Sequence, residues 1–224
     1  MIIMANVSQF EHSLLSHHMT RIRDVKSDTL VFRQSIQVIG ELLAYETLRT
    51  LDTKSEPIHT PLAAHDGRSV CERVALVPIL RAGLAMVDPF IRMLPHASVL
   101  HLGMYRDEET ATPVWYYNKL EEDLSNITAF VLDPMLATGG SLIAAIDELK
   151  SRGAGRIRVA SIIAAPEGID AVTGAHPDVA INVCEVDSHL NDAAFIVPGL
   201  GDAGDRYFGT VQSDKGCRPC SINH

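Results

Sequence analysis

The chain has little positive charge and no long hydrophobic run, and these two absences limit what it can be. It holds 19 lysines and arginines against 28 aspartates and glutamates, a formal net charge of −9. Proteins that bind nucleic acid generally carry a basic face, so this balance disfavours such a partner but leaves room for a local basic pocket. The most apolar stretch, residues 74–87, is interrupted by Pro78 and Arg81 and is too short to cross a membrane. We therefore expect neither a nucleic-acid nor a membrane partner.

Targeting and metal-binding signals are also scarce. The N-terminus lacks a basic region followed by a long apolar run, so no signal peptide is visible and we expect a cytoplasmic protein. Cys71 and Cys184 lie far apart in apolar stretches and are predicted to be buried free thiols. Cys217 and Cys220 form one CxxC pair, which supplies two of the four ligands of a zinc site, so a site there would need His224 or another subunit. We expect no metal held directly by side chains.

The composition that is present suits one α/β domain, with 46% hydrophobic and 21% charged residues in a chain of 224. Residues 1–27 are polar and rich in histidine, and we interpret them as an N-terminal arm. Residues 28–210 are predicted to form the main domain. Residues 211–224 show no apolar periodicity and are predicted to be a flexible tail.

Strand-like and helix-like segments alternate along the predicted domain. Apolar residues recur at 4-3-4 spacing from Phe32 to Leu43, which predicts a helix over residues 28–50. The continuous apolar run at 127–132 is typical of a central strand buried on both faces. Other strands are predicted at 74–80, 98–105, 112–119, 158–165 and 179–186, other helices at 84–94, at 141–152 and after Pro166, and a loop with short strands at 52–72. The alternation predicts an α/β fold with a mostly parallel central sheet and helices on both faces.

The most informative segment is VLDPMLATGGS at residues 131–141, where the buried strand ends and a helix begins. In open α/β sheets ligands bind at the carboxyl ends of strands, and a helix start offers unpaired N–H groups and partial positive charge to a phosphate. Gly139 and Gly140 let the backbone approach a ligand, and Thr138 and Ser141 add hydroxyl donors. On these residues alone, a plain strand-to-helix turn is an equal alternative. The Walker A and Rossmann patterns are absent.

Two further features could serve a phosphorylated or planar ligand. Arg81 ends an apolar run at a predicted strand end, where a guanidinium could fork onto pyrophosphate oxygens. The glycine-rich stretch GLGDAGD at 199–205 exposes backbone N–H and C=O groups that could read a flat base. A bland loop with aspartate turns stays open for this stretch.

The segment at 131–141 resembles the loop that binds phosphoribosyl pyrophosphate (PRPP) in type I phosphoribosyltransferases, and its DPMLATGGS form is similar to that of the uracil phosphoribosyltransferases. Four more segments agree with that branch in the same order, namely PILRAGL at 78–84, GMYRDEET at 103–110, AAPEGI at 164–169 and IVPGLGDAGDR at 196–206. The resemblance covers about residues 12–210. One departure is Pro134, which stands where the family commonly has a second acid, so a two-carboxylate ribose clamp is unavailable.

The resemblance implies a pentosyltransferase that joins uracil to the ribose 5-phosphate of PRPP, giving UMP and pyrophosphate in pyrimidine salvage. It implies a type I phosphoribosyltransferase fold with a β-hairpin flap and a small base-binding hood. It also implies Mg²⁺ bound mainly through PRPP, a homo-oligomer that is a dimer or a tetramer, and activation by GTP as in some relatives. No residue of the sequence places a GTP site.

The same resemblance assigns roles to individual residues. The catalytic candidates are Arg81, Arg106 and Asp202. No side chain is an obvious general base, and Asp202 is our own candidate for that role. The residues expected to bind PRPP are Arg81, Arg106, Asp133, Pro134, Met135, Leu136, Ala137, Thr138, Gly139, Gly140, Ser141 and Asp202. Those expected to bind uracil are Ile196, Gly201, Asp202 and Ala203. Asp133 could hold sugar hydroxyls or a hydrated Mg²⁺, and both arginines would stabilise the leaving pyrophosphate.

Residues 105–119 are predicted to form the flap that closes over PRPP and excludes water. For the aromatic residues Trp115, Tyr116 and Tyr117, core packing is favoured over lining the site. Two other functions stay open. One is a non-catalytic RNA-binding pyrimidine regulator on the same fold, which would need a basic face. The other is a phosphoribosyltransferase for another base, such as a purine.

Overall fold

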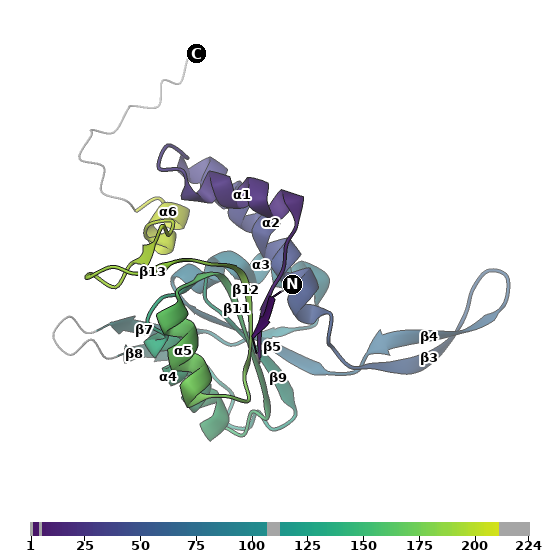
Figure 1. Ribbon diagram of the computed structural model, residues 1–224. Helices are drawn as coiled ribbons and strands as arrows, with labels where there is room; N and C mark the ends of the chain where they lie inside the picture. Colours follow the sequence, from purple (N-terminus) through teal and green to yellow (C-terminus); the bar gives the residue numbers. More distant parts are fainter. Residues whose placement is uncertain (1, 5, 107–112, 211–224) are drawn as a thin grey trace, which may run out of the picture.

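Apolar strands from the middle of the chain build one sheet, and helices cover both of its faces in the computed structural model (Figure 1). The structure describes residues 2–4, 6–106 and 113–210, with the backbone alone at 2–4, 105, 106 and 113. The sheet runs in the order β1-β2-β12-β11-β9-β5-β7-β8. Its interior pairs from β2 to β7 are parallel, and the pairs β1–β2 and β7–β8 at its two edges are antiparallel. The predicted α/β fold is therefore confirmed.

The strands of this sheet are β1 (Ile2–Met4), β2 (Val7–Gln9), β5 (Arg73–Leu80), β6 (Ser98–Val99), β7 (Leu102–Arg106), β8 (Pro113–Asn118), β9 (Ile127–Leu132), β10 (Met135–Leu136), β11 (Arg156–Ala164) and β12 (Ala180–Val186). At its centre Val131 of β9 lies opposite Val77 of β5 and Val159 of β11, and all three are fully buried. An apolar run without alternation is what a strand covered on both faces requires. The strand predicted at 127–132 is confirmed with those bounds.

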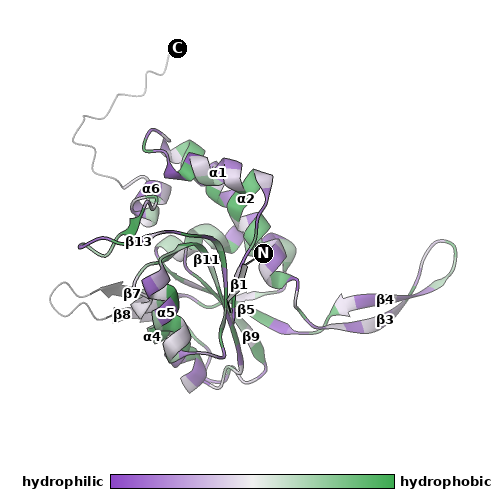
Figure 2. Ribbon diagram, in the orientation of Figure 1, coloured by the Kyte–Doolittle hydropathy of each residue, from purple (hydrophilic) through white to green (hydrophobic). Residues whose placement is uncertain are grey.

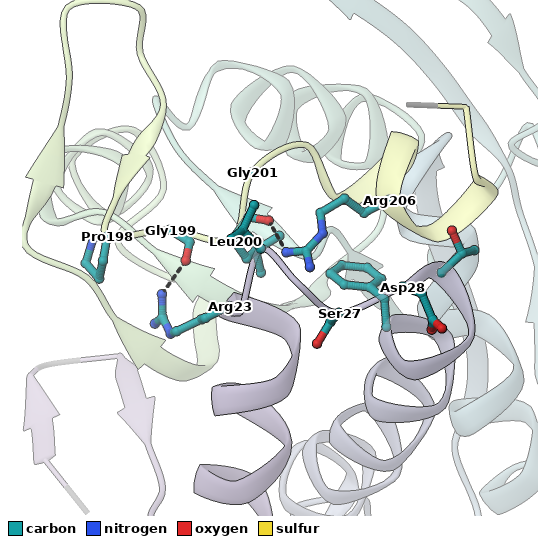
Figure 3. Close-up of a pocket in the computed structure, with 11 residues that line it drawn as sticks. Arg23, Ser27, Asp28, Pro198, Gly199, Leu200, Gly201 and Arg206 are labelled. Atoms are coloured by element: carbon teal, nitrogen blue, oxygen red, sulfur yellow. Dashed lines mark hydrogen bonds between the residues drawn. The ribbon is translucent and has the colours of Figure 1, made fainter. Parts of the chain in front are cut away.

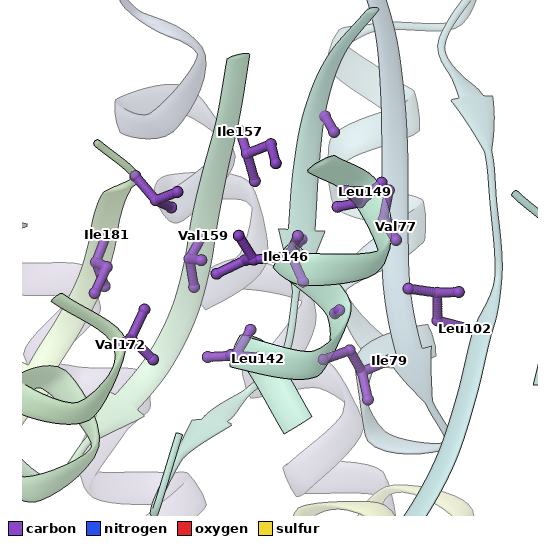
Figure 4. Close-up of a cluster of buried hydrophobic side chains, with 14 of the residues drawn as sticks. Val77, Ile79, Leu102, Leu142, Ile146, Leu149, Ile157, Val159, Val172 and Ile181 are labelled. Atoms are coloured by element: carbon purple, nitrogen blue, oxygen red, sulfur yellow. The ribbon is translucent and has the colours of Figure 1, made fainter. Parts of the chain in front are cut away.

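The helices are α1 (Ser13–Arg23), α2 (Thr29–Leu48), a 3-10 helix (Ala82–Met86), α3 (Val87–Met93), α4 (Gly140–Ser151), α5 (Pro166–Ala175) and α6 (Ala203–Phe208). On one face α4 and α5 bury Leu142, Ile146 and Val172 against the sheet (Figure 4). On the other face α1, α2 and α3 pack a second cluster that includes Phe32 and Phe90. Burial of these apolar side chains on both faces is the main term that stabilises the fold.

Packing crosses the predicted boundary between the N-terminal arm and the domain at residue 27. Strand β2 adds to the sheet beside β12, and Val7 is buried there. Helix α1 buries Leu15, Met19 and Ile22 against the second cluster. These residues repeat at spacings of four and three, so the first 27 residues contain a helical signal and form part of the packed core.

Residues 52–72, predicted as loop with short strands, form one regular hairpin instead. Strands β3 (Thr53–His59) and β4 (Ala64–Val70) pair along seven residues and project away from the sheet (Figures 1 and 2). Nearly every residue of the hairpin is exposed, so no face is buried and the sequence carries no alternating pattern there. At its base Arg156 donates to Asp52 at 2.9 Å and to Glu72 at 2.8 Å.

Two predictions about side-chain burial are corrected. Cys184 is buried as expected, and burial raises the pKa of its thiol, but Cys71 is exposed because it follows the projecting hairpin. Trp115, Tyr116 and Tyr117 are 37%, 53% and 43% exposed, so the core packing favoured for them is wrong. They belong to the edge strand β8, which among the described strands pairs only with β7. Among the described helices, none combines the length and apolarity needed to cross a membrane.

Candidate functional site

The predicted site residues follow the carboxyl ends of parallel strands. Arg81 comes directly after β5 and Arg106 ends β7, while residues 133–141 follow β9. Residues 187–203, with the small antiparallel pair β13 (His189–Leu190) and β14 (Ile196–Val197), follow β12. Because these strands run in the same direction, their ends meet at one edge of the sheet, where α/β proteins bind ligands. The fold thus brings segments more than a hundred residues apart to one place.

The loop between β9 and α4 forms a cradle of backbone amides. Gly139 precedes the helix in the left-handed region, with φ 81°, and no side chain caps the helix start. The first amide that bonds back is that of Ile143, which donates to the carbonyl of Gly139 at 2.9 Å. The amides of Gly140, Ser141 and Leu142 come before it and have no intrahelical partner. They border a cavity of about 180 Å³, which is lined by Asp133, Met135, Leu136, Ala137, Thr138, Gly139, Gly140, Ser141 and Leu142.

This cradle has the properties of a phosphate site. A twelve-residue helix presents partial positive charge at its start, and free amides there bind anions. In the described part of the chain, the hydroxyls of Thr138 and Ser141 make no hydrogen bond to protein, so both are available as donors. All residues predicted for this loop except the buried Pro134 border the cavity.

Gly139 has a role beyond the ligand approach predicted for it. A Cβ at this position would lie 3.0 Å from the carbonyl oxygen of Gly168 and 3.1 Å from a methyl of Val172. Both neighbours belong to α5, so the missing side chain allows the loop to pack against that helix. A Cβ on Gly168 would in turn lie 2.2 Å from the carbonyl oxygen of Ala137. Close backbone contact with α5 therefore holds the cradle in shape.

Asp133 lies at the carboxyl end of β9, half-buried beside the cradle. Burial raises the pKa of its carboxyl to about 7, and the single donor that opposes this shift is the amide of Met135, 3.2 Å from Oδ1. A carboxyl so poorly solvated would gain from sugar hydroxyls or a hydrated cation. Within the described residues, no group of three histidines, cysteines or acids could hold a metal.

Arg81 lies next to the start of α6. Its Nη2 donates to Oδ1 of Asp205 at 2.9 Å, and its side chain is 57% exposed. The hydroxyl of Thr210 and the Arg81 guanidinium both bond Asp205, and they hold the pKa of that carboxyl below its usual range. Oδ1 of Asp202 caps α6 by accepting from the amide of Asp205 at 2.8 Å. Asp205 was given no role from the sequence, although an acid three residues after Asp202 at a helix start is a signal of this arrangement.

The predicted base-binding residues divide into exposed and buried ones. Gly201 and Asp202 are exposed beside Arg81 and α6. The side chains of Ile196 and Ala203 are each 4% exposed and pack into the second core cluster, so they could offer a ligand mainly backbone groups. Gly201 has a positive φ of 77°, which suits a chain that turns sharply around a small ligand.

A larger cavity of about 480 Å³ lies on the α1–α2 side of this stretch (Figure 3). It is lined by Arg23, Val25, Ser27, Asp28, Thr29, Phe32, Pro198, Gly199, Leu200, Gly201 and Arg206. Figure 3 shows Arg23 reaching Gly199 and Arg206 reaching Leu200. Neither arginine was given a role from the sequence. Arg23 comes from α1, 176 positions before Gly199, whereas Arg206 lies only six positions after Leu200.

Three predictions concern residues outside the described part of the structure. The Arg106 side chain, the flap tip at 107–112, and Cys217 and Cys220 in the tail all belong there. The flap strands themselves are present, since β7 and β8 pair antiparallel with a register shift between Gly103 and Met104.

Comparisons with known proteins find one family that the chain resembles over most of its length. The family model described as uracil phosphoribosyltransferase matches residues 9–210. Uracil phosphoribosyltransferase of Lactiplantibacillus plantarum is 50% identical over 208 residues, which are 92% of this chain and 100% of that protein. That of Roseiflexus castenholzii is 50% identical over 200 residues, 89% of this chain and 96% of that protein.

Solved structures show the same fold. The AQ2163 protein from Aquifex aeolicus superposes with a TM-score of 0.84 at 35% identity, over 90% of this chain and 97% of that one. Adenine phosphoribosyltransferase from Leishmania donovani shares the fold with a TM-score of 0.58 at 12% identity, over 86% of this chain and 88% of that one. Taken with the amide cradle and the glycine-rich stretch at one sheet edge, the match over nearly the whole sequence shows that the chain belongs to the uracil phosphoribosyltransferase family.

Proposed function

We propose that this protein transfers the 5-phosphoribosyl group of PRPP to uracil, forming UMP and pyrophosphate. The observation that carries the proposal is the uncapped start of α4, whose free amides open on a cavity at the same sheet edge as Arg81 and the glycine-rich stretch. The amides of Gly140 to Leu142 would hold the 5-phosphate of PRPP. The ribose would then lie over Asp133, and its C1 carbon would face the stretch at 199–203.

The reaction breaks the bond between ribose C1 and pyrophosphate, so negative charge grows on the leaving group. The exposed guanidinium of Arg81 can exchange Asp205 for pyrophosphate oxygens, because a surface ion pair contributes only about 0–1 kcal/mol. Arg106, at the end of β7, would bind the same group from the flap side. Mg²⁺ carried by PRPP would supply further neutralising charge. Stabilising the developing charge in this way is usually the largest catalytic term.

Uracil would be read by backbone groups around Gly201 to Ala203, which present donors and acceptors to its alternating edge. Its N1 would attack C1 from the face opposite to the departing pyrophosphate. Asp202 is the candidate acceptor of the N1 proton. Since its Oδ1 already accepts from the α6 start, we assign that role to its other oxygen.

Several finer properties belong to the proposal. We expect a homo-oligomer, a dimer or tetramer, in the cytoplasm, with Mg²⁺ required for turnover, GTP as an activator, and a β7–β8 hairpin that closes over PRPP. The proposed division of the sequence is 1–27, 28–210 and 211–224, with the first of these segments packed onto the domain through β2 and α1. Light scattering gives the subunit number. Initial rates with and without EDTA test the need for Mg²⁺, and initial rates with and without GTP test activation.

Base selectivity is the direct test of the function. Purified protein is incubated with PRPP and Mg²⁺ and with uracil, cytosine, hypoxanthine or guanine, and nucleotide and pyrophosphate are both measured. We expect equal amounts of UMP and pyrophosphate from uracil and a rate near background from the others. Turnover of a purine in preference to uracil would replace the proposal with the alternative of another base. A filter-binding assay with pyrimidine-operon RNA separates the regulator alternative, which the net charge of −9 disfavours.

A further inference from the structure

The backbone of the base-binding stretch is held from behind by a buried ion pair. Gly199 donates its N–H to Oδ2 of Asp187 at 2.8 Å, and its C=O accepts from Nη1 of Arg23, also at 2.8 Å. Nη1 of Arg23 donates to the same Asp187 oxygen at 2.9 Å. We propose that Arg23 and Asp187 are positioning residues that hold the Gly199 peptide so that the following residues can recognise uracil, an inference that rests on the proposed function.

We call the pair Arg23 and Asp187, with its bonds to Gly199, the clamp, and its burial makes it rigid. The side chains of Arg23 and Asp187 are 19% and 4% exposed, and Glu185 accepts from Nη2 of Arg23 at 2.7 Å. A planar guanidinium engages carboxylates through two parallel N–H groups, which fixes direction as well as distance. Bonds between charged groups that are shielded from water are stronger than bonds at an open surface. The N–H and the C=O of Gly199, which belong to two consecutive peptide groups, are thus both bonded by one rigid pair.

A second arginine fixes the next peptide in the same direction. Nη1 of Arg206 donates to the carbonyl of Leu200 at 2.7 Å, and its Nη2 donates to the carbonyl of Asp24 at 2.8 Å. The guanidinium lies 4.4 Å from the ring centre of Phe32. Two consecutive carbonyls, at 199 and 200, are therefore each held by an arginine, Arg23 of α1 and Arg206 of α6. The two arginines thereby set the orientation of the backbone groups that follow from Gly201, which we assign to recognition of the base.

The clamp assigns part of uracil recognition to the first 27 residues. Arg23 is the last residue of α1, and 164 positions separate it from Asp187. A ligand group must be held to within a fraction of an ångström by its supporting residues to contribute fully to affinity. Loosening the clamp should therefore weaken uracil binding and leave the PRPP cradle, which α4 and α5 support, unchanged.

The test compares Arg23→Lys and Asp187→Asn with wild type in steady-state assays that vary uracil and PRPP separately. Lysine keeps the charge but cannot fork, and asparagine keeps the size but loses the charge. We expect each variant to raise the KM for uracil about 10- to 100-fold, the equivalent of one charge-assisted hydrogen bond, with the KM for PRPP changed less than about twofold. A structural defect alone would move both KM values or the fraction of active protein together.

Glu185→Gln is the matched control. It removes the other carboxylate from Arg23, but Glu185 does not contact Gly199. We expect a change of about threefold or less in the KM for uracil. The bond that Arg23 donates to a neutral glutamine is weaker, but Asp187 still aligns the guanidinium. If Glu185→Gln raised the KM for uracil as much as Asp187→Asn, the charge around Arg23 would set the affinity for uracil, and the bonds to Gly199 would not.

The remaining outcomes also decide the inference. Folded variants with an unchanged KM for uracil would overturn it, and so would failure of both variants to fold, since the pair would then be purely structural. Wild-type protein is assayed first. If the wild type formed no UMP, the proposed function itself would be wrong. If the wild type turned over and the variants had its KM for uracil, only the role of the clamp would be wrong.

Discussion

The phosphate cradle and the base-binding stretch lie at the same sheet edge but are held in different ways. The cradle is one continuous segment at the start of α4, and the helix itself supplies the amides and the partial charge. The base-binding stretch is irregular, with glycines at positive φ, and side chains outside it bond its backbone. Arg23 lies 176 positions from Gly199, whereas Asp187 lies 12 positions from Gly199 and Arg206 lies 6 positions from Leu200. A ligand site built on a helix start takes its amides and charge from the helix and is held by backbone packing against α5, whereas a site built on an irregular loop depends on side chains that bond its backbone.

The largest expected effect is on PRPP affinity, and it comes from adding a negative charge to the cradle. Ser141→Asp places a carboxylate in the first turn of α4, where it would repel the 5-phosphate and weaken PRPP binding by roughly 1,000-fold or more. The same change should leave the fold as stable or stabilise it by about 0.3–1 kcal/mol, because an acid suits a helix start. Calorimetric titration with PRPP and thermal unfolding measure the two effects.

Ser141→Ala is the control for this change, since it removes the hydroxyl without adding charge. We expect a loss of about tenfold in PRPP affinity, the value of one hydrogen bond. If Ser141→Asp bound PRPP as well as wild type, the 5-phosphate would lie elsewhere, and the assignment of the cradle as the phosphate site would be wrong.

Arg81→Ala should lower kcat/KM by about 100- to 1,000-fold, because it removes a cation from the leaving pyrophosphate. The melting temperature should hardly change, since the side chain is 57% exposed and its ion pair with Asp205 is a surface one. Arg92→Ala is the matched control, as Arg92 is 67% exposed and pairs with Glu41 at 3.0 Å. Equal activity of the two variants would argue against a role for Arg81 in the reaction.

Gly199→Ala tests how strictly the base-binding stretch is shaped. Gly199 has φ 65°, and a Cβ there would lie 2.1 Å from the carbonyl oxygen of Ile196, so the peptide must shift. We expect the KM for uracil to rise about 10- to 100-fold and the protein to lose about 1–3 kcal/mol of stability. In α5, Gly174→Ala adds a Cβ into open space and should change neither KM. An unaltered KM for uracil in Gly199→Ala would mean that the stretch adapts and needs no support.

Asp133→Asn should change the pH dependence of stability. The carboxyl has a pKa of about 7 in the fold against an ordinary value of 3.8, so the folded state keeps its proton where the unfolded state releases it. Wild-type stability should therefore fall as the pH rises from about 4 to about 7, by at most about 4 kcal/mol, and level off above. Asparagine removes this loss, so the variant should be the more stable protein at pH 8 and equal at pH 4. Urea unfolding at pH 4, 6 and 8 checks this, and parallel profiles would rule it out.

Much of the fold could be predicted because its elements bury one face or two. The run at 127–132 and the periodic helix α2 contain the signal that burial imposes on a sequence. The hairpin β3–β4 could not be recognised because its residues face solvent on both sides. Burial of a single residue was equally hard to predict, and Cys71 shows why, since its exposure follows from the hairpin before it.

The candidate site also has one part that could be predicted from the sequence and one part that could not. The cradle could be predicted because a strand end, two glycines and a helix start are neighbours in the sequence. Arg23 and Asp187 could not, because 164 residues separate them and only the parallel sheet brings their segments together. Asp202 was proposed as a binding residue from the resemblance alone, and its use as the α6 cap involves Asp205, whose partner Arg81 follows β5.

The most direct measurement of the central claim is an amide NMR titration of ¹⁵N-labelled protein with ribose 5-phosphate and then with uracil and PRPP. The account predicts that the amides of Gly140, Ser141 and Leu142 shift strongly with ribose 5-phosphate, as new hydrogen bonds to phosphate form, whereas those of residues 199–203 shift only when uracil is added. Unshifted amides at 140–142 in phosphate-saturated protein would contradict it.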